Sequence, residues 1–243
     1  MRLFGLIGYP LSHSFSKKYF TEKFAAEGID NCQYGLFPLA SVSELAGLLS
    51  AHPQLEGLNV TIPYKKQVTD FIDLRAMPAG LTACNCIRIR NGKLTGYNTD
   101  IIGFEQSLLP LLQPHHTKAL VLGNGGAAEA VIFVLNKLKI RYDVVSRRMH
   151  KGSTLTYNDL DEAIIDSSTI IINTTPLGMY PGVNECPGIP YQYLSVQHLL
   201  YDLVYNPAKT LFLQKGEERG AVIKNGEEML VLQAEESWRI WNV

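Results

Sequence analysis

Lys65 is a candidate for acid–base chemistry because of the segment that precedes it. The stretch Asn59–Lys65 begins at the end of an apolar run and continues through Ile62 and Pro63. A residue before proline favours extended backbone, so the predicted strand ends there, and Pro63 suits the first turn of a helix. An amine at the carboxyl edge of an open α/β sheet can give or take a proton, because burial and neighbouring charges shift its pKa readily. The alternative interpretation is an ordinary surface lysine on an amphipathic helix.

Asp100 is the acid that would complete such a site. It follows Asn98 and Thr99, directly after a predicted hairpin. A carboxylate close to Lys65 would stabilise the ammonium form, and the two groups together could pass a proton to or from a hydroxyl. Alternatively, Asn98 or Thr99 is only a helix N-cap, and Asp100 is only stabilised by the helix dipole.

Amide and hydroxyl side chains suited to a polar ligand occur around these two residues. Asn59 and Asn85 have amides that can hydrogen-bond a polyol, and Ser14, Ser16 and Thr61 have hydroxyls that suit a carboxylate or hydroxyl group. Taken singly, each of them also fits ordinary turn chemistry. They form a candidate binding set only together with the lysine and the aspartate.

A glycine-rich turn marks a second candidate site. The pattern Gly123-x-Gly125-x-x-Ala128 follows an apolar strand and opens a helix that is predicted to run to Leu138. Glycines let the backbone approach a pyrophosphate, and the first turn of the helix offers free N–H groups and a favourable dipole. A tight strand–helix turn without a ligand is the alternative. The pattern predicts that a dinucleotide is bound by Gly123, Asn124, Gly125, Gly126 and Ala127.

The end of the next strand indicates which dinucleotide is bound. NAD enzymes usually place an acid there for the ribose hydroxyls, but this chain has Ser146, Arg147 and Arg148, with Lys151 close behind. A hydroxyl and two guanidinium groups suit a 2′-phosphate. Asp143 lies at about the spacing of the usual acid, but it precedes the last apolar residues and should sit in mid-strand. The sequence therefore predicts NADP, and the alternative is a solvated basic loop.

The elements that position these residues alternate between strands and helices, which predicts an α/β fold with parallel sheets covered by helices. Strands are predicted at 3–8, 33–39, 55–61, 84–90, 93–97, 119–122, 142–145, 169–172, 198–203 and 221–224. Helices are predicted up to Gly28, at 42–49 with Ser41 or Ser43 as its cap, at 101–112, up to Leu138, near 159–165, and at 208–215 and 227–241. Asn91-Gly92 predicts a hairpin with a type I′ turn, and 114–116 mark the boundary before a second sheet.

Composition excludes several classes of function. The chain has 243 residues, 46% of them hydrophobic and 19% charged, which is typical of one large or two modest soluble domains. A net charge of -1 without a basic run gives no reason to propose nucleic acid, and no membrane-spanning or signal segment is present, so a cytoplasmic protein is expected. Cys84-x-Cys86 is too tight for a usual zinc pair, so no metal is predicted and the cysteines are expected to be structural.

Together these residues resemble the shikimate dehydrogenase family. The resemblance runs along nearly the whole chain and is most specific in NVTIPYK at 59–65 and GYNTD at 96–100. The other matching stretches are GYPLSHSFS at 8–16, Asn85, IIGF at 101–104, GNGGAAEA at 123–130, NTTPLGM at 173–179, YDLVYNP at 201–207 and MLVLQAEESWRIW at 229–241.

The resemblance implies a function and two domains. The implied reaction is the reversible NADP-dependent reduction of 3-dehydroshikimate to shikimate, in the pathway to chorismate and the aromatic amino acids. Residues 1–100 and 226–243 would form the substrate domain, with a mostly parallel sheet, and 101–225 a Rossmann-like NADP-binding domain. The implied catalytic pair is Lys65 and Asp100; the implied substrate ligands are Ser14, Ser16, Asn59, Thr61, Asn85, Tyr205 and Gln233; and the implied loop beside the nicotinamide contains Thr174, Thr175, Pro176 and Met179.

The chain departs from the family pattern in three places, and alternatives stay open. Lys17-Lys18-Tyr19-Phe20 replaces the usual proline and histidine–asparagine pair, Glu228 replaces a glycine, and Ser146-Arg147-Arg148 replaces Asn-Arg-Thr. The alternatives are a quinate/shikimate dehydrogenase that uses NAD, a more distant methylenetetrahydrofolate dehydrogenase, and a catalytically silent NADP-binding sensor. The oligomeric state is open between monomer and homodimer.

Overall fold

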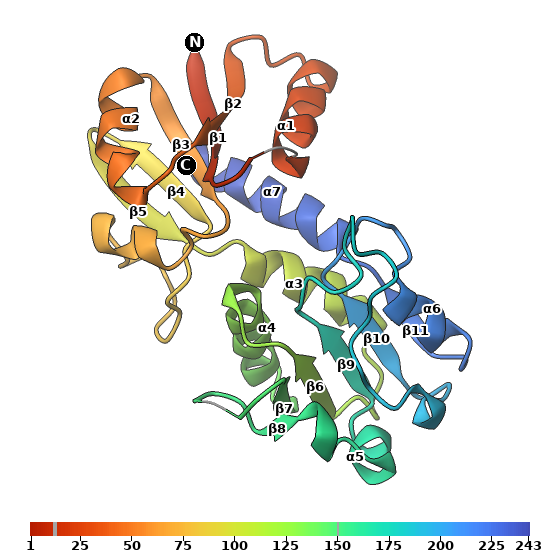
Figure 1. Ribbon diagram of the computed structural model, residues 1–243. Coiled ribbons are helices and arrows are strands. Elements are labelled where there is room, and N and C mark those ends of the chain that lie inside the picture. The colour runs from red at the N-terminus through yellow and green to blue at the C-terminus, as the bar shows by residue number, and fades with distance from the viewer. Residues whose placement is uncertain (12–13, 150) are drawn as a thin grey trace. The chain divides into compact units, whose positions relative to one another are not determined.

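The chain forms two compact α/β units, each built around one sheet (Figure 1). The computed structural model describes residues 1–11, 14–149 and 151–243, so Ser12 and His13 of the 8–16 motif lie outside the described residues. Unit 1 comprises Met1–Ile102 and Val231–Val243, and unit 2 comprises Gly103–Leu230. The α/β fold class predicted from the sequence is confirmed.

Unit 1 contains a five-stranded mixed sheet of order β2-β1-β3-β4-β5. Its strands are β1 (Arg2–Gly8), β2 (Cys32–Pro38), β3 (Leu55–Val60), β4 (Cys86–Arg90) and β5 (Lys93–Tyr97). Its helices are α1 (Phe15–Ala26), α2 (Leu45–Ala51), two 3-10 segments at Val42–Glu44 and Gln67–Phe71, and part of α7 (Glu227–Trp241). β1 is parallel to β2 and β3, whereas β4 is antiparallel to both of its neighbours, β3 and β5. The sheet is therefore mixed rather than mostly parallel.

The tight turn of the β4–β5 hairpin follows the prediction. Asn91 and Gly92 have φ angles of 51° and 73°, as the two central residues of a type I′ turn require. Asparagine and glycine adopt this left-handed conformation at the lowest cost. The predicted hairpin is confirmed.

The prediction of a helix that starts at Pro63 was wrong. The segment after β3 is a turn in which Tyr64 N–H donates to the Thr61 carbonyl at 2.9 Å, and the Ile62–Pro63 peptide bond is cis. Helical structure begins only at Gln67, as a 3-10 segment. The Tyr64 side chain is buried and its hydroxyl donates to the Leu39 carbonyl at 2.5 Å, so this turn is fixed by a tertiary contact that local sequence does not reveal.

Both faces of the unit 1 sheet are covered. Phe4 and Leu6 of β1 point to one face, where they pack with residues of α1 and α7. Ile7 points to the other face and packs with Leu58 and with Leu45 of α2. This alternation along β1 is the period-two pattern of a strand that lies between two helical layers.

Unit 2 contains a six-stranded sheet in which all pairs are parallel. Its strands are β6 (Lys118–Leu122), β7 (Arg141–Ser146), β8 (Leu155–Thr156), β9 (Ile170–Asn173), β10 (Leu199–Asp202) and β11 (Val222–Lys224). The order β8-β7-β6-β9-β10-β11 is 3-2-1-4-5-6 when the strands are counted from β6, which is the order of Rossmann folds. The predicted Rossmann-like domain is confirmed, although the two-residue β8 was not predicted.

The helices of unit 2 differ from the predictions mainly at their ends. They are α3 (Asp100–Leu108), which begins in unit 1, α4 (Gly126–Lys137), α5 (Glu162–Ser167) and α6 (Leu211–Glu217), with 3-10 segments at Leu109–Leu111, Tyr157–Asp159 and Tyr191–Tyr193. α3 ends four residues before the predicted Leu112, because Pro110 cannot continue an α-helix. α6 begins at Leu211 rather than at 208, and the side chain of Thr210 is its N-cap.

The sheet of unit 2 is buried between two helical layers. Leu120, Ile171 and Leu200 pack on the face covered by α5 and α6. On the other face the Tyr201 ring lies 5.1 Å from the Phe104 ring of α3. Strands buried on both faces explain the near-continuous apolar runs of the sequence.

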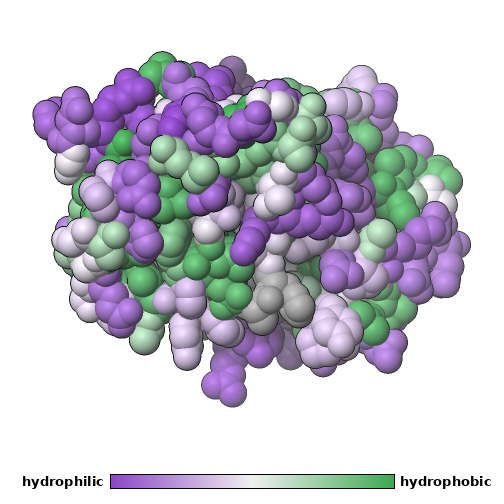
Figure 2. Space-filling model, turned by 90° about the horizontal axis from the view of Figure 1, so that it is seen from above, coloured by the Kyte–Doolittle hydropathy of each residue, from purple (hydrophilic) through white to green (hydrophobic). Residues whose placement is uncertain are grey.

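The surface carries mixed polar and apolar residues. Figure 2 shows hydrophilic side chains over much of one face, with hydrophobic ones in smaller groups between them. Within 1–11, 14–149 and 151–243, no helix has the length and the apolar composition needed to cross a membrane.

The close approach of Gly57 to Trp241 gives a first prediction. A Cβ at Gly57 would lie 2.3 Å from the indole nitrogen, which donates to the Ile87 carbonyl at 3.0 Å. Gly57→Ala is therefore expected to lower the free energy of unfolding by about 1–3 kcal/mol in urea titrations, since the buried indole must move.

Gly47→Ala is the matched control. Gly47 lies inside α2, and a Cβ there would meet no atom within 4 Å. The same substitution should stabilise the protein by roughly 0.5–1 kcal/mol, because alanine favours a helix. Equal effects of the two variants would contradict the packing argument.

Candidate active site

The predicted site residues of unit 1 lie around one edge of its sheet. β1 connects to β2 on one side and has β3 on its other side, so the carboxyl ends of β1 and β3 flank a switch point, where open sheets bind ligands. Thr61 and Lys65 follow β3, and Ser14 and Ser16 follow β1. β4 runs antiparallel to β3, and β5 runs antiparallel to β4, so the start of β4 and the end of β5 lie at the same edge as the end of β3. Asn85 precedes β4 and Asp100 follows β5, and both therefore lie near this edge.

Lys65 and Asp100 form an ion pair. The Lys65 Nζ and Asp100 Oδ2 atoms are 2.7 Å apart, and the side chains are only 22% and 10% exposed. The predicted contact is confirmed. The Cys84 N–H donates to the Lys65 carbonyl at 2.7 Å, so the backbone of the lysine is tied to the segment before β4.

Asn85 fixes the orientation of Asp100. Its Nδ2 donates to Asp100 Oδ1 at 2.8 Å and to Thr99 Oγ1 at 3.0 Å, and its Oδ1 accepts from the Thr99 N–H at 2.7 Å. Asp100 also begins α3, where the helix dipole favours a carboxylate. The two interpretations of Asp100 from the sequence are therefore compatible, since one residue both begins a helix and pairs with the lysine.

Asn59 and Gln233 belong to the same buried network. Asn59 Nδ2 donates to Ser237 Oγ at 2.9 Å, and Gln233 Oε1 accepts from Thr99 Oγ1 at 3.3 Å. Ser237 and Gln233 are one helical turn apart on α7 and face the same way. The structure thus brings Asn59, Asn85, Asp100, Lys65 and Gln233 together, as predicted.

Tyr34 and Ser237 are two members of this network that the sequence did not predict. The Tyr34 hydroxyl donates to Asn59 Oδ1 at 2.7 Å and also interacts with Ser16. Burial raises the pKa of Tyr34 well above its usual value, so the hydroxyl keeps its proton and remains a donor. The sequence did not indicate these contacts, because Asn59 is 25 positions from Tyr34 and 178 positions from Ser237.

Ser14, Thr61 and Tyr205 occupy less specific environments. The Ser14 hydroxyl accepts from the Lys17 N–H at 3.2 Å and so caps α1, which is the turn chemistry that the sequence allowed. Thr61 packs beside Gly8 at the end of β1. Tyr205 belongs to unit 2, where it follows β10 and is 37% exposed.

The glycine turn of unit 2 has the geometry of a dinucleotide site. Gly123 has a φ of +100°, and a Cβ there would lie 2.9 Å from Thr174 Oγ1 and Thr175 Cγ2, so only glycine fits. Gly125 precedes α4 in extended conformation with open space around it, and Gly126 begins the helix. A helix N-terminus that follows such a turn is the usual place of a bound phosphate.

The carboxyl end of β7 carries the predicted basic residues. The Ser146 hydroxyl donates to the Arg148 carbonyl at 2.6 Å, while the side chains of Arg147 and Arg148 are exposed. Asp143 sits in mid-strand, as predicted, and pairs with Lys118 Nζ at 2.9 Å. Burial opposes its ionisation, but hydrogen bonds from Lys118 and Thr154 hold the pKa of Asp143 below its usual value.

The segment after β9 lies beside the glycine turn. Thr174 donates to the Leu122 carbonyl from both its N–H (3.0 Å) and its hydroxyl (2.8 Å). Thr175 is half-buried, and Pro176 and Met179 are exposed. Because β6 and β9 are adjacent and lead away to opposite sides of the sheet, this segment and the glycine turn flank the switch point of the Rossmann fold.

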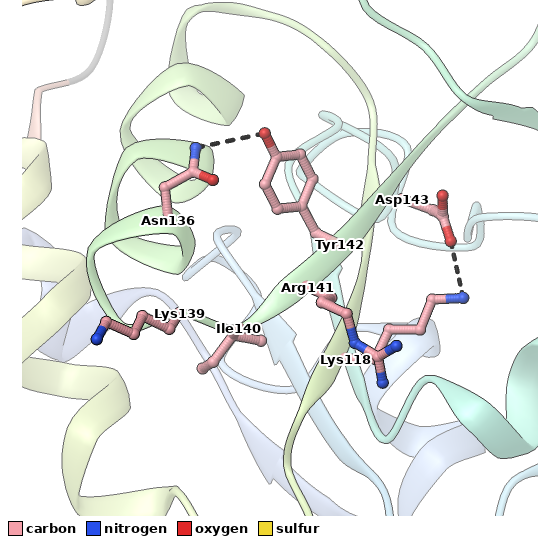
Figure 3. Close-up of a pocket in the computed structure, with 7 residues that line it drawn as sticks. All are labelled: Lys118, Asn136, Lys139, Ile140, Arg141, Tyr142 and Asp143. Carbon is pink, nitrogen blue, oxygen red and sulfur yellow. Dashed lines mark hydrogen bonds and ion pairs between the residues drawn. The ribbon is translucent and has the colours of Figure 1, made fainter.

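A cavity of about 510 Å³ lies at the opposite edge of this sheet (Figure 3). It is lined by Lys118, Asn136, Lys139, Ile140, Arg141, Tyr142 and Asp143. Lys118 and Arg141 are the first residues of β6 and β7, so the cavity is at the amino ends of the strands and contains none of the predicted cofactor residues. In the part of the chain that the structure describes, no three His, Cys, Asp or Glu side chains group as metal ligands would.

Comparisons with known proteins agree with these motifs. Residues 6–87 match the family model described as the shikimate dehydrogenase substrate binding domain. A curated relative from Methanococcus maripaludis, named shikimate dehydrogenase (NADP(+)), is 36% identical over 99% of this chain and 91% of its own.

Solved structures give the same result. A chorismate mutase/shikimate 5-dehydrogenase fusion protein from Clostridium acetobutylicum is 33% identical, with a TM-score of 0.86 over 100% of this chain and 91% of that one. Shikimate 5-dehydrogenase from Thermus thermophilus, in complex with NADP(H) and shikimate, is 26% identical, with a TM-score of 0.85 over 99% and 93% of the two chains.

The buried contact between Tyr34 and Asn59 gives a second prediction. Tyr34→Phe removes the donor to Asn59 Oδ1, which leaves a buried carbonyl without that partner. The free energy of unfolding should fall by about 1–3 kcal/mol in urea titrations. Tyr9→Phe is the control, at a tyrosine of the same unit that is 54% exposed, and it should change the free energy of unfolding little. An equal loss of stability in both variants would refute the stabilising role of the Tyr34–Asn59 hydrogen bond.

Proposed function

The chain belongs to the shikimate dehydrogenase family, and we propose from this premise that it catalyses the reversible NADPH-dependent reduction of 3-dehydroshikimate to shikimate, in the pathway to chorismate and the aromatic amino acids. The observation that carries the proposal is the Lys65–Asp100 ion pair, at the edge of the sheet where a ligand can reach it. We assign Lys65 and Asp100 as the catalytic pair. The proposed substrate ligands are Ser14, Ser16, Asn59, Thr61, Asn85, Tyr205 and Gln233.

Lys65 is suited to move the proton of this reaction. Reduction of a ketone to an alcohol needs a hydride at carbon and a proton at oxygen, and a lysine ammonium can donate that proton. Asp100 stabilises the ammonium at 2.7 Å, and Asn85 keeps the carboxylate oriented. In the oxidation of shikimate, the neutral amine would accept the proton of the hydroxyl instead.

The residues of unit 2 fit a bound dinucleotide. NADPH, when bound, supplies the hydride. The Gly123 turn has no space for a side chain, and a Cβ at Gly125 would meet no atom within 4 Å, so a pyrophosphate can approach the backbone before α4. The proposed cofactor ligands are Gly123, Asn124, Gly125, Gly126, Ala127, Ser146, Arg147, Arg148, Thr174, Thr175, Pro176 and Met179.

The same residues support NADP as the preferred cofactor. Arg147 and Arg148 are exposed beyond the end of β7 and can reach a 2′-phosphate. The carboxylate that could bind a ribose diol, Asp143, is engaged with Lys118 inside the strand. Together with the NADP(+) named for the curated relative, this favours NADP over NAD.

The two proposed binding functions are divided between the two α/β domains. We assign 1–100 with 226–243 as the substrate domain and 101–225 as the cofactor domain, with Tyr205 as the one proposed substrate ligand from the second of these. We also propose a cytoplasmic location. The cysteines Cys32, Cys84, Cys86 and Cys186 are all free thiols, as is usual in a reducing compartment.

Substitution of the catalytic lysine tests the proposal directly. Lys65→Ala should lower kcat for shikimate oxidation with NADP by about 10²–10⁴-fold, because the proton acceptor is lost. Formation of NADPH is followed by absorbance. Lys66→Ala, at the exposed neighbouring lysine, should keep near wild-type turnover. Unchanged turnover in Lys65→Ala would disprove the role of Lys65.

Cofactor choice is tested at Arg147. Arg147→Ser should lower the ratio of kcat/KM for NADP to kcat/KM for NAD by about tenfold or more, because one charge-assisted contact to the 2′-phosphate is lost. Arg219→Ala, at an exposed arginine after α6, is the control and should leave the ratio unchanged. Parallel assays with quinate and NAD test the remaining alternative. If quinate is the better substrate, the proposed activity is wrong.

A further inference from the structure

A buried carboxylate lies at the end of β10, outside the site described above. Asp202 is the last residue of the strand and is 0% exposed. Its oxygens accept three hydrogen bonds: from Thr210 Oγ1 at 2.5 Å, from Asn173 Nδ2 at 2.9 Å, and from the Val204 N–H at 3.0 Å. Burial raises the pKa of the Asp202 carboxyl to about 6, although all three donors counteract this, so at neutral pH the group is still an ionised acceptor.

Asn173 transmits this contact to the segment that follows β9. Its Oδ1 accepts from both the N–H (3.0 Å) and the hydroxyl (2.7 Å) of Thr175, and its Nδ2 also reaches the Leu177 carbonyl at 3.3 Å. The Thr175 hydroxyl in turn accepts from the Leu177 N–H at 3.3 Å. One buried amide, held by one buried carboxylate, thus fixes the backbone of 175–177.

The fixed segment contacts the glycine turn. Thr174 and Thr175 lie against Gly123, where a Cβ would meet both of them at 2.9 Å. At the other end of the segment, Gly178 has a φ of +89°, and a Cβ there would lie 3.2 Å from Thr210. The hydroxyl of that same Thr210 donates to Asp202. The segment 174–178 is therefore held from both ends by the Asp202 network.

We propose that Asp202 and Asn173 are positioning residues for the cofactor: they hold Thr174–Met179 against the glycine turn in the conformation that binds the dinucleotide. The inference rests on the proposed function only in that the bound dinucleotide is NADP. Neither residue touches the cofactor in this proposal, and both act through the backbone of the segment.

A purely structural role does not require a charged residue at this position. An ionised carboxylate that is completely buried costs desolvation free energy, and well-packed apolar residues of similar volume often stabilise a fold equally well or better. The carboxylate, however, can accept from three donors on three segments at once, namely the end of β9, the backbone after β10 and the start of α6. Orientation of those segments is what the charged group provides.

The test is the affinity for NADP⁺, measured by titration calorimetry with NADP⁺ alone. Asp202→Asn retains the shape of the side chain but replaces one acceptor oxygen by a donor, and Asn173→Ser removes the link to Thr175. Both variants should bind NADP⁺ at least about tenfold more weakly, which is the effect of losing one well-placed polar contact. KM for shikimate should change much less than the NADP⁺ affinity, because every proposed substrate ligand except Tyr205 lies in unit 1.

Tyr201→Phe is the matched control. Tyr201 is also completely buried on β10, and its hydroxyl is 2.7 Å from that of Ser107, on the α3 face of the sheet. Its loss should lower the unfolding temperature without a change in the dissociation constant of NADP⁺. Circular dichroism establishes that each variant is folded, and Asn173→Ser still tests the inference if Asp202→Asn does not fold.

Two results with the variants would overturn the inference. One is an unchanged NADP⁺ dissociation constant in the folded variants, which would leave Asp202 and Asn173 with a structural role only. The other is an equal loss of affinity in Tyr201→Phe, which would indicate general loosening of unit 2. A wild-type protein that binds NADP⁺ but does not oxidise shikimate would refute the proposed function, and the inference would still be decided by the binding data. A wild-type protein that does not bind NADP⁺ would refute both.

Discussion

The ion pair between Lys65 and Asp100 is the interaction on which unit 1 depends. Two charged groups that are mostly shielded from water must be paired and hydrogen-bonded, and here Asn85 supplies the additional bond to the carboxylate. That requirement fixes the ends of β3 and β5 relative to each other, because each carries one charge. Asn59, Thr99 and the inner face of α7 are then held through the same set of hydrogen bonds.

Strand order explains why two unrelated sets of side chains are placed in the same way. In both sheets the polar residues follow the carboxyl ends of two neighbouring strands that lead to opposite sides, β1 and β3 in unit 1 and β6 and β9 in unit 2. Open α/β sheets bind their ligands in the crevice at such a point. The strand order of each sheet therefore brings these polar residues to one edge. It does so independently of the contacts between their side chains.

Local patterns in the sequence therefore predicted much of the fold and of the candidate site. Alternating strands and helices, the Asn91-Gly92 turn and the Gly123 turn were recognised because each depends on neighbouring residues. The turn at Pro63 and the roles of Tyr34 and Ser237 were missed, because each depends on a contact far along the chain. The mixed character of the first sheet is a topological property, and the two-residue β8 is too short for any period to appear.

The discontinuity of unit 1 has a consequence for synthesis. Residues 231–243, which carry Gln233, Ser237 and Trp241, leave the ribosome only after all of unit 2 has been made. Trp241 stacks on Phe4 with ring centroids 4.9 Å apart, so a residue of the first strand of unit 1 is covered by a residue that follows unit 2 in the chain. Unit 2 is continuous in sequence and can fold during translation, whereas unit 1 closes its core only after residues 231–243 have been made.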